Sequence, residues 1–285
     1  MMAIAGIVMV IFCVLGGYII FGGKIGIIIE AMPKELMIIG GSAAGAFMIG
    51  QSSHGLKHAL GAVKKIVGGS KFHKEHYIQL ITLMYSMTKL MKQKGSIAVE
   101  AHIENPTEST LFQKAPLILG DKFGLSLICD YMRMITLGLT SPHEVESIIE
   151  KELAKYKEEE MHPSHAWQSM ADGMPALGIV AAVLGVIKTM GSITEPPEVL
   201  GQLIGGALVG TFLGVFLAYG FVGPIASRLK GVVDEEMRFY ETVMAIMIAH
   251  LNGYAPAVSA ETGRKSVPSE YMPTFNELEE ALNQA

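Results

Sequence analysis

Four long stretches of this sequence contain no Asp, Glu, Lys or Arg, and they constrain the fold more than any other feature. They cover residues 1–23, 36–56, 173–187 and 199–227. A helix needs about 20 apolar residues to cross the roughly 30 Å of hydrocarbon in a bilayer. Three stretches reach that length, and the third does so when it continues past Lys188, whose side chain can extend toward the surface. The sequence therefore predicts an integral membrane protein.

Composition excludes several other classes of protein. Charged residues make up 17% of the 285 residues, whereas an ordinary soluble domain has about 25%. The formal net charge of −5 argues against a nucleic-acid partner, because such proteins carry a basic patch. The two cysteines, Cys13 and Cys129, are too few for a disulfide framework or a four-ligand zinc site. With no phosphate-binding glycine loop and no nucleophile elbow, we expect neither an enzyme nor a resident metal or cofactor.

The lysines and arginines predict the orientation of the chain in the bilayer. Of 22 such residues, only Lys24, Lys34 and Lys188 lie in the short connections 24–35 and 188–198. The others follow the second and fourth stretches, and the positive-inside rule places such flanks in the cytoplasm. Because the number of spans is even, both termini are expected in the cytoplasm too.

These observations together predict an all-α integral membrane protein with four transmembrane helices, a large helical cytoplasmic insert and a cytoplasmic C-terminal tail. The insert has apolar residues at helical spacing, and its longest uncharged run, 77–88, has the 12 residues of a core helix. We expect a long helix to connect the insert to the third span. The predicted spans are 1–23, 36–54, 171–193 and 199–224, with the insert at 55–168 and the tail at 225–285.

The tail is expected to extend the fourth span as a charged helix over residues 228–250. The segment Asn252-Gly253-Tyr254-Ala255-Pro256 then breaks the pattern, since Gly and Pro commonly follow the end of a helix. A short acidic helix is predicted near residues 277–280, close to the C-terminus.

Small residues recur every four positions along the predicted spans. Such stripes allow helix backbones to approach closely in a bilayer, where lipid offers no hydrophobic driving force for helix association. Two interpretations stay open, packing within one chain and packing against another subunit or a partner helix. The stripes are Gly206, Gly210, Gly214 and Ala218 in the fourth span, Gly41 and Gly45 in the second, and Gly178 and Ala182 in the third.

None of the predicted spans contains an acidic residue in its interior, and Asp172 lies at the cytoplasmic end of the third. Transport of a proton or cation through a bilayer normally needs an ionisable group at depth, because that group binds the ion. We therefore expect a second chain to supply the carboxylate if this protein conducts ions. Thr211 is the clearest polar group at depth, with Tyr219 two turns later. A threonine in a span can also simply hydrogen-bond to its own helix.

Two prolines and two charge clusters are further candidates for function. Pro175 lies near the start of the third span and Pro224 near the end of the fourth, and each can set a hinge or mark a helix end. In the insert, a basic cluster precedes an acidic one, which suits either an electrostatic docking surface or an ordinary solvated face. The two clusters are Lys89, Lys92 and Lys94, and then Glu100, Glu104 and Glu108.

Several long motifs resemble the MotA family, the larger stator subunits of the bacterial flagellar motor. The segment Ala207-Leu-Val-Gly-Thr-Phe-Leu-Gly-Val-Phe, with Pro224 eight residues later, resembles the family's fourth span. Met174-Pro-Ala-Leu-Gly-Ile-Val-Ala-Ala-Val-Leu-Gly is similar to its third span. The similarity extends to Val99-Glu-Ala-His-Ile-Glu-Asn-Pro in the cytoplasmic loop, and to Leu251-Asn-Gly-Tyr-Ala-Pro and Gly263-Arg-Lys in the tail.

The resemblance implies a proton-channelling stator subunit in the bacterial inner membrane. Family members have four spans and form a ring of five around two MotB chains, whose span supplies an ion-binding aspartate. Their cytoplasmic domains act on the rotor protein FliG. Glu100 matches the family's acidic rotor-contacting residue, and Lys92 falls where the family commonly has arginine, so the planar bidentate contact is lost.

The resemblance also assigns roles within the membrane. Pro175 and Pro224 match prolines that couple ion passage to movement, and Thr211 matches a threonine near the ion path. Ala182 replaces the threonine of sodium-driven relatives, which indicates protons, and Tyr219 completes the predicted pathway. Two alternatives are an ExbB/TolQ-like energiser of another membrane process, whose members usually have three spans, and a membrane scaffold without ion flux.

Overall fold

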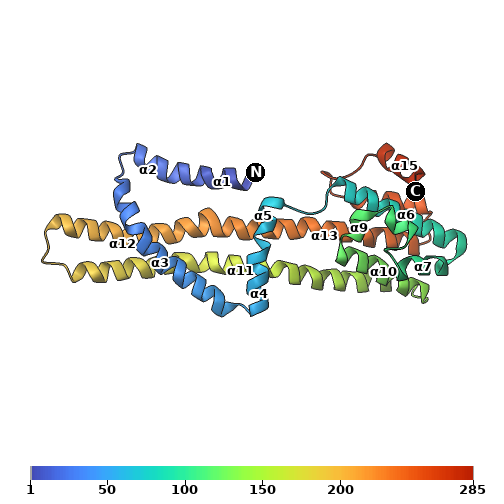
Figure 1. The fold of residues 1–285 in the computed structure, drawn as a ribbon, viewed down its shortest axis with the longest axis horizontal. Helices are drawn as coiled ribbons and strands as arrows, with labels where there is room; N and C mark the ends of the chain where they lie inside the picture. Colours follow the sequence, from blue (N-terminus) through green and yellow to red (C-terminus); the bar gives the residue numbers. More distant parts are fainter. Residues whose placement is uncertain (1, 285) are drawn as a thin grey trace. The chain divides into compact units, whose positions relative to one another are not determined.

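The computed structural model describes residues 2–284, and every regular element in that part of the chain is a helix (Figure 1). The first half contains α1 (Met2–Ile11), the π-helical turn η1 (Phe12–Gly16), α2 (Gly17–Ile20), α3 (Ile25–Gly50), α4 (Ser53–Ala62), α5 (Lys64–Gly68), α6 (Lys74–Lys94), the 3₁₀ turn η2 (Ser96–Val99), α7 (Glu100–Glu104), α8 (Thr110–Gln113), α9 (Pro116–Leu119) and α10 (Lys122–Thr136). The second half contains α11 (Pro142–Met190), α12 (Pro197–Leu217), the π-helical turn η3 (Ala218–Val222), α13 (Gly223–Leu251), α14 (Pro256–Ser266) and α15 (Phe275–Asn283). The all-helical prediction is confirmed.

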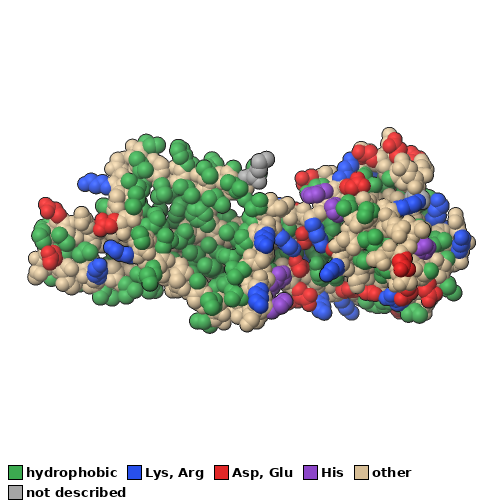
Figure 2. Space-filling view, in the orientation of Figure 1, with side chains coloured by type: hydrophobic (Ala, Val, Ile, Leu, Met, Phe, Trp, Pro, Cys, Tyr) green, Lys and Arg blue, Asp and Glu red, His purple; other side chains and the backbone are tan. Residues whose placement is uncertain are grey.

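The chain divides into two compact units, which we describe separately. The apolar unit comprises Met1–Gly69 and Glu160–Val232, and the polar unit comprises Ser70–Glu159 and Val233–Ala285. Hydrophobic side chains dominate the visible surface of the apolar unit, whereas Lys, Arg, Asp and Glu gather on that of the polar unit (Figure 2).

Within residues 2–284, three helical stretches are long and apolar enough to cross a membrane, namely Met2–Ile20, Pro142–Met190 and Pro197–Leu251. No residue of α1, η1 or α2 is buried, which suits a helix that presents apolar side chains to lipid on all sides. Helix α3 is absent from this set because Glu30, Lys34 and Glu35 occupy its first half. The structure thus supports a membrane protein, and the count of four spans stays a prediction.

The long helix predicted between the insert and the third span is present as α11, which runs without a break for 49 residues. The predicted charged extension of the fourth span is also present, since helical structure continues from α12 through η3 into α13. Helix α13 ends at Leu251, and Gly253 follows with a φ of +84°, a left-handed conformation that Gly adopts without strain.

Large aromatic side chains form the core of the polar unit. The Phe72 and Phe239 rings stack with centroids 3.9 Å apart, and Phe123 stacks on Tyr156 at 3.6 Å. Tyr240 meets the edges or faces of Phe72, Phe123 and Tyr156 at centroid distances of 4.8–5.6 Å. Such stacked and edge-to-face contacts add to the hydrophobic stabilisation of buried rings. This core joins segments that are far apart in the sequence.

The tail of the polar unit folds as two short helices with defined ends. Arg264 in α14 is buried, and its guanidinium binds both carboxylate oxygens of Glu261 at 2.6 and 2.7 Å. It also donates to the carbonyl of Pro273 at 3.0 Å. Helix α15 begins with a capping box in which the side chains of Thr274 and Glu277 each accept from the other's backbone N–H. The helix predicted near residues 277–280 is therefore confirmed.

Candidate functional site

The central feature of the apolar unit is a close approach of α11 and α12 through glycines. A Cβ added to Gly178 would lie 2.9 Å from the carbonyl oxygen of Gly210 and 3.0 Å from the Cα of Gly214. A Cβ on Gly214 would lie 2.8 Å from the carbonyl oxygen of Met174. The opposing atoms belong to the backbone and cannot rotate away. Only residues without a Cβ fit this crossing, so the glycine stripes of α11 and α12 pack within one chain.

The glycine stripe on α3, formed by Gly41 and Gly45, has no helix packed closely against it in the described part of the chain. A Cβ on Gly41 or Gly45 would meet no other atom within 4 Å in the part of the chain that the structure describes. This stripe is open, so close packing within the chain does not explain its glycines.

Two of the predicted ion-path residues lie at the glycine crossing. A Cβ on Gly210 would lie 3.1 Å from the backbone nitrogen of Ala182, and Thr211 is the next residue of α12. The side chains of Ala182 and Thr211 are both half-buried. Tyr219 is not part of this cluster, since it lies two turns further along in η3 and is 69% exposed.

The two prolines lie within continuous helical structure. Pro175 is inside α11, directly after Met174, whose carbonyl faces Gly214. Pro224 is the second residue of α13, directly after the π-helical turn η3. Because Pro224 has no N–H, the carbonyl of Gly220 lacks its usual helical donor, and the wider turn coincides with that missing bond. Neither proline simply marks a helix end, although the sequence had left that possibility open.

The predicted rotor-contacting residues lie in neighbouring elements of the polar unit. Lys92 is in the last turn of α6, and Glu100 is the first residue of α7. The short turn η2 connects them, after Gly95 turns the chain with a φ of +87°. Both side chains are exposed, and neither forms an ion pair within residues 2–284. They are free to meet another protein.

The rest of the acidic cluster is partly neutralised within the polar unit. Arg133 binds Glu104 through its Nε at 2.7 Å and Asp130 through a terminal nitrogen at 2.8 Å. Glu104 is therefore tied to α10, whereas Glu100 and Glu108 project into solvent. The sequence spacing alone did not separate the paired glutamate from the other two.

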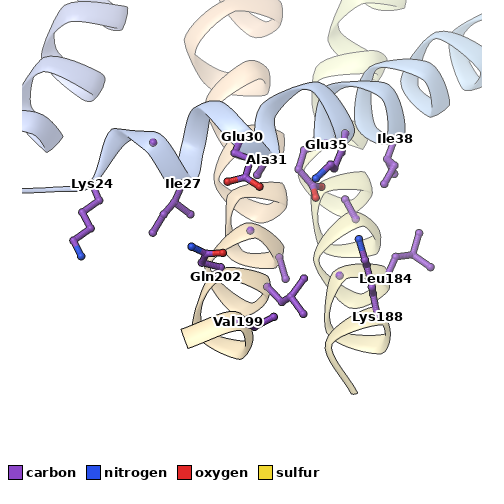
Figure 3. Close-up of a pocket in the computed structure, with 17 residues that line it drawn as sticks. Lys24, Ile27, Glu30, Ala31, Glu35, Ile38, Leu184, Lys188, Val199 and Gln202 are labelled. Atoms are coloured by element: carbon purple, nitrogen blue, oxygen red, sulfur yellow. The ribbon is translucent and has the colours of Figure 1, made fainter. Parts of the chain in front are cut away.

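The structure also shows an acidic side chain that the predicted span boundaries missed. The sequence placed residues 24–35 in a connection, but helix α3 begins at Ile25 and includes all of them except Lys24. Glu35 is buried, at 7% exposure, and it lines a cavity of about 640 Å³ (Figure 3). The predicted second span, 36–54, begins one residue after Glu35, and the structure places this carboxylate in the same helix as that span.

A helical pattern in the sequence could have revealed Glu35. The buried residues of α3 recur at intervals of three and four, and Glu35 occupies one of these positions. An acidic residue in the middle of an apolar stripe belongs to the helix and not to a loop. The buried positions are Ile28, Ala31, Glu35, Ile39 and Ala43.

Histidines and other metal-ligand side chains do not gather into a binding site in the described part of the chain. Across residues 2–284, no group of three or more His, Cys, Asp and Glu side chains is placed to hold a metal ion. His73 and His76 instead cap α6, where the backbone N–H of His73 donates to Nδ1 of His76 at 3.3 Å. Burial raises the pKa of the Cys129 thiol to about 11, so this cysteine stays protonated and is a poor nucleophile or ligand at neutral pH.

Comparison with known protein families identifies two matching regions. Residues 4–95 match the family model described as motility protein A N-terminal. Residues 127–242 match the MotA/TolQ/ExbB proton channel family. The first region contains α3 and Glu35, and the second contains the glycine crossing and both prolines.

Relatives of known identity align with nearly the whole chain. Motility protein A of Salmonella typhimurium is 39% identical over 98% of this chain and 94% of its own length. Motility protein A of Escherichia coli is 38% identical with the same coverage, and chemotaxis protein LafT of Vibrio parahaemolyticus is 34% identical over 97% of this chain and 96% of its own.

Two solved structures share the fold. The structure of C. jejuni MotAB matches with a TM-score of 0.74 at 20% identity, over 95% of this chain and 98% of that one. The flagellar MotAB stator complex from Bacillus subtilis matches with a TM-score of 0.69 at 23% identity, over 98% of both chains. Together with the family models and the near-full-length relatives, these matches show that the chain belongs to the motility protein A family.

Proposed function

We propose that this chain is a stator subunit of the bacterial flagellar motor, which forms a proton channel with a MotB-like partner and converts ion flow into torque on the rotor. The observation that carries the proposal is the 39% identity to a motility protein A over nearly the full length of both chains. The expected assembly is a ring of five copies around a MotB-like dimer. The two similar solved structures are of MotAB, which supports such a partnership.

The proposed location is the bacterial inner membrane, with both termini and the polar unit in the cytoplasm. The apolar surface of α1 and the three long apolar helices support a membrane location. The concentration of lysines behind the predicted second and fourth spans supports the orientation. This orientation makes the polar unit accessible to a cytoplasmic rotor protein such as FliG.

Within the membrane, Thr211 and Ala182 line the proposed proton route toward an aspartate of the partner. Their common position at the glycine crossing supports this role, because the two helices present both residues at one level. Tyr219 is exposed on the same helical segment and is available to a neighbouring chain. The alanine at position 182, where sodium-driven relatives carry threonine, supports a proton as the transported ion.

The alternative, an ExbB/TolQ-like energiser, shares one of the two matching family models. That model covers residues 127–242 and does not separate the two functions. Residues 4–95, however, match a model specific to motility protein A, and the relatives above are motility or chemotaxis proteins. The stator function is therefore favoured.

The first test is deletion of the gene, with swimming and flagellar filaments scored in the same cells. A stator subunit is dispensable for filament assembly, so we expect normal filaments that do not turn, and rotation restored by the wild-type gene. The rotation speed should persist when sodium is replaced by potassium and stop when a protonophore is added. Unimpaired swimming in a strain without a second stator gene would overturn the proposal.

A charge reversal tests the proposed rotor contact. Lys92→Glu and Glu100→Lys should each reduce torque in tethered cells, because both exposed side chains would then repel their rotor partners. Each loss should be partly restored by a reversed charge on the rotor protein. Glu108→Lys is the matched control, since this side chain is also exposed but does not match the rotor-contacting residue. If no rotor substitution restores torque, direct docking at Lys92 and Glu100 is wrong.

Replacement of the prolines tests the coupling role. Pro175→Ala and Pro224→Ala each supply an N–H and should straighten the local helix. We expect normal membrane levels and normal co-purification with the MotB-like partner, but a loss of rotation. Pro163→Ala, in the same helix as Pro175, is the control and should retain torque. Failure of the complex to assemble would instead assign the prolines a structural role.

A further inference from the structure

The cavity between α3, α11 and α12 contains an acidic side chain without a partner. Glu35 is 7% exposed, and its Oε2 atom is fully buried. Within residues 2–284 this oxygen accepts no hydrogen bond, and the carboxylate forms no ion pair. A buried, unpaired carboxylate is strongly unfavourable, so it requires a proton, water or a cation beside it. In a membrane protein such a group is retained for a function.

The surroundings of Glu35 offer water but little direct compensation. The cavity volume of about 640 Å³ far exceeds the roughly 10–15 Å³ that one water molecule needs. Figure 3 shows the Glu35 carboxylate pointing from α3 toward the space between α11 and α12, with Lys188 and Gln202 on those helices. Polar groups and apolar side chains line the same space. The cavity can therefore hold water in contact with the carboxylate.

The groups that line the cavity suit a proton better than a metal cation, because they offer few oxygen ligands. The other charged lining residues are Glu30 and Lys34 on α3, Lys24 just before it, and Lys188 on α11, while α12 contributes the neutral Gln202. Three lysines and two carboxylates leave a surplus of positive charge, which opposes every cation equally, so the number of oxygen ligands decides between them. A sodium ion needs several oxygen ligands. A proton needs only Glu35 and a connected water molecule.

The same carboxylate touches the proposed ion route. A Cβ on Gly210 would lie 2.7 Å from Oε2 of Glu35, so the missing side chain of this glycine makes room for the carboxylate. Gly210 directly precedes Thr211 and lies against Ala182. Glu35 therefore connects the cavity to the glycine crossing.

We propose that this cavity is a hydrated proton-entry vestibule, and that Glu35 is the group that takes up the proton there. In each step a hydronium ion transfers one proton to the carboxylate, which leaves water and a neutral carboxylic acid. The reverse transfer to another water molecule of the cavity then restores the carboxylate. The inference rests on the proposed stator function and adds a proton-binding residue of this chain to the one expected from the partner.

The test uses the whole chain with its MotB-like partner in cells from which the chromosomal gene is deleted. Proton entry is followed with a cytoplasmic pH-sensitive fluorescent protein, and motor speed is followed at low load while the external pH varies from 6 to 8.5. We expect Glu35→Gln to lower proton flux by about tenfold or more, as on loss of a positioned proton carrier. It should also flatten the dependence of speed on external pH. Glu198→Gln is the control, because this exposed glutamate of α12 does not line the cavity.

A second variant separates a titrating role from a structural one. Glu35→Asp keeps the carboxyl group and should assemble with the partner, conduct protons and retain the pH dependence. Should Glu35→Gln fail to assemble, a conducting Glu35→Asp with wild-type pH dependence would still support the vestibule. If Glu35→Gln conducts like the wild type, or if neither variant assembles, the inference is wrong. Wild-type rotation in the same experiment shows that the stator function itself is intact, whereas a wild type that never turns the motor would overturn that function instead.

Discussion

The apolar unit and the polar unit achieve close packing by opposite means. In the apolar unit, α11 and α12 approach until backbone atoms meet, and glycines remove every side chain that would separate them. In the polar unit, fully buried rings such as Phe72, Phe239 and Tyr240 fill the space between helices. In the polar unit the surrounding water drives the packing, because it favours burial of large apolar surfaces. Lipid provides no such driving force, so the packing of the apolar unit depends on close contact between helix backbones.

The largest expected effect comes from the aromatic core of the polar unit. Phe239→Ala removes a fully buried ring that stacks on Phe72 and contacts Tyr77. We expect the free energy of unfolding to fall by about 3–5 kcal/mol, which is typical of large-to-small substitutions in a well-packed core. The measurement is thermal or denaturant unfolding of the purified protein, followed by a probe in the polar unit. Phe275→Ala is the control, since this ring is 58% exposed and its removal should change stability by less than about 0.5 kcal/mol.

A smaller loss of stability is expected in the apolar unit, where the substitution adds a side chain and does not remove one. Gly214→Ala adds a methyl group where backbone atoms of α11 lie 2.8 Å away, and we expect a loss of about 1–3 kcal/mol. Gly41→Ala adds the same group where the described chain has no atom within 4 Å. It should be neutral or stabilise α3 slightly, because Ala favours a helix over Gly by roughly 0.5–1 kcal/mol. The measurement is the thermal stability of the two variants in detergent. Equal losses of stability would show that another chain packs against the stripe on α3.

The smallest expected change in stability concerns the exposed N-terminus of α15. The pKa of Glu277 is lowered from 4.5 to about 2. The main cause is a hydrogen bond from Lys74, and hydrogen bonds from the backbone N–H and the hydroxyl of Thr274 add to it. A depressed carboxyl pKa stabilises the folded state fully above about pH 4.5, and this stabilisation is lost as the pH falls toward 2. Amide hydrogen exchange in α15 should therefore accelerate over this range, and Glu277→Gln should remove the pH dependence. Unchanged exchange between pH 5 and 2 in the wild type would contradict the capping role.

Local sequence patterns predicted several elements of both units correctly. The helical spacing of apolar residues predicted α6, and the break predicted after residue 250 is present, since α13 ends at Leu251 and Gly253 follows. The short acidic helix near the C-terminus is α15. These features depend on neighbouring residues alone, through hydrogen bonding within a helix and the conformational freedom of Gly, so they can be recognised without the rest of the fold.

Contacts between distant segments could not be obtained in this way. The stripes on α3 and α12 look alike in the sequence, yet only that on α12 packs against another helix of the chain. Glu104 and Glu100 also look alike, and the position of Arg133 on α10 distinguishes them. The π-helical turn before Pro224 has no sequence signature of its own. Each of these features depends on which atoms of a remote segment lie nearby.

The sequence by itself determined the membrane character, the helical class and the family of this protein. Four charge-free stretches long enough to cross a bilayer indicate a membrane protein, and the long motifs of the third and fourth spans are specific to the family. Only the tertiary structure revealed that the Glu35 carboxylate is buried without a partner among residues 2–284 and lies against Gly210, beside the proposed ion route. Burial is a property of the assembled helices. A carboxylate that resembles part of a polar loop in the sequence becomes an unpaired charge only when three helices enclose it.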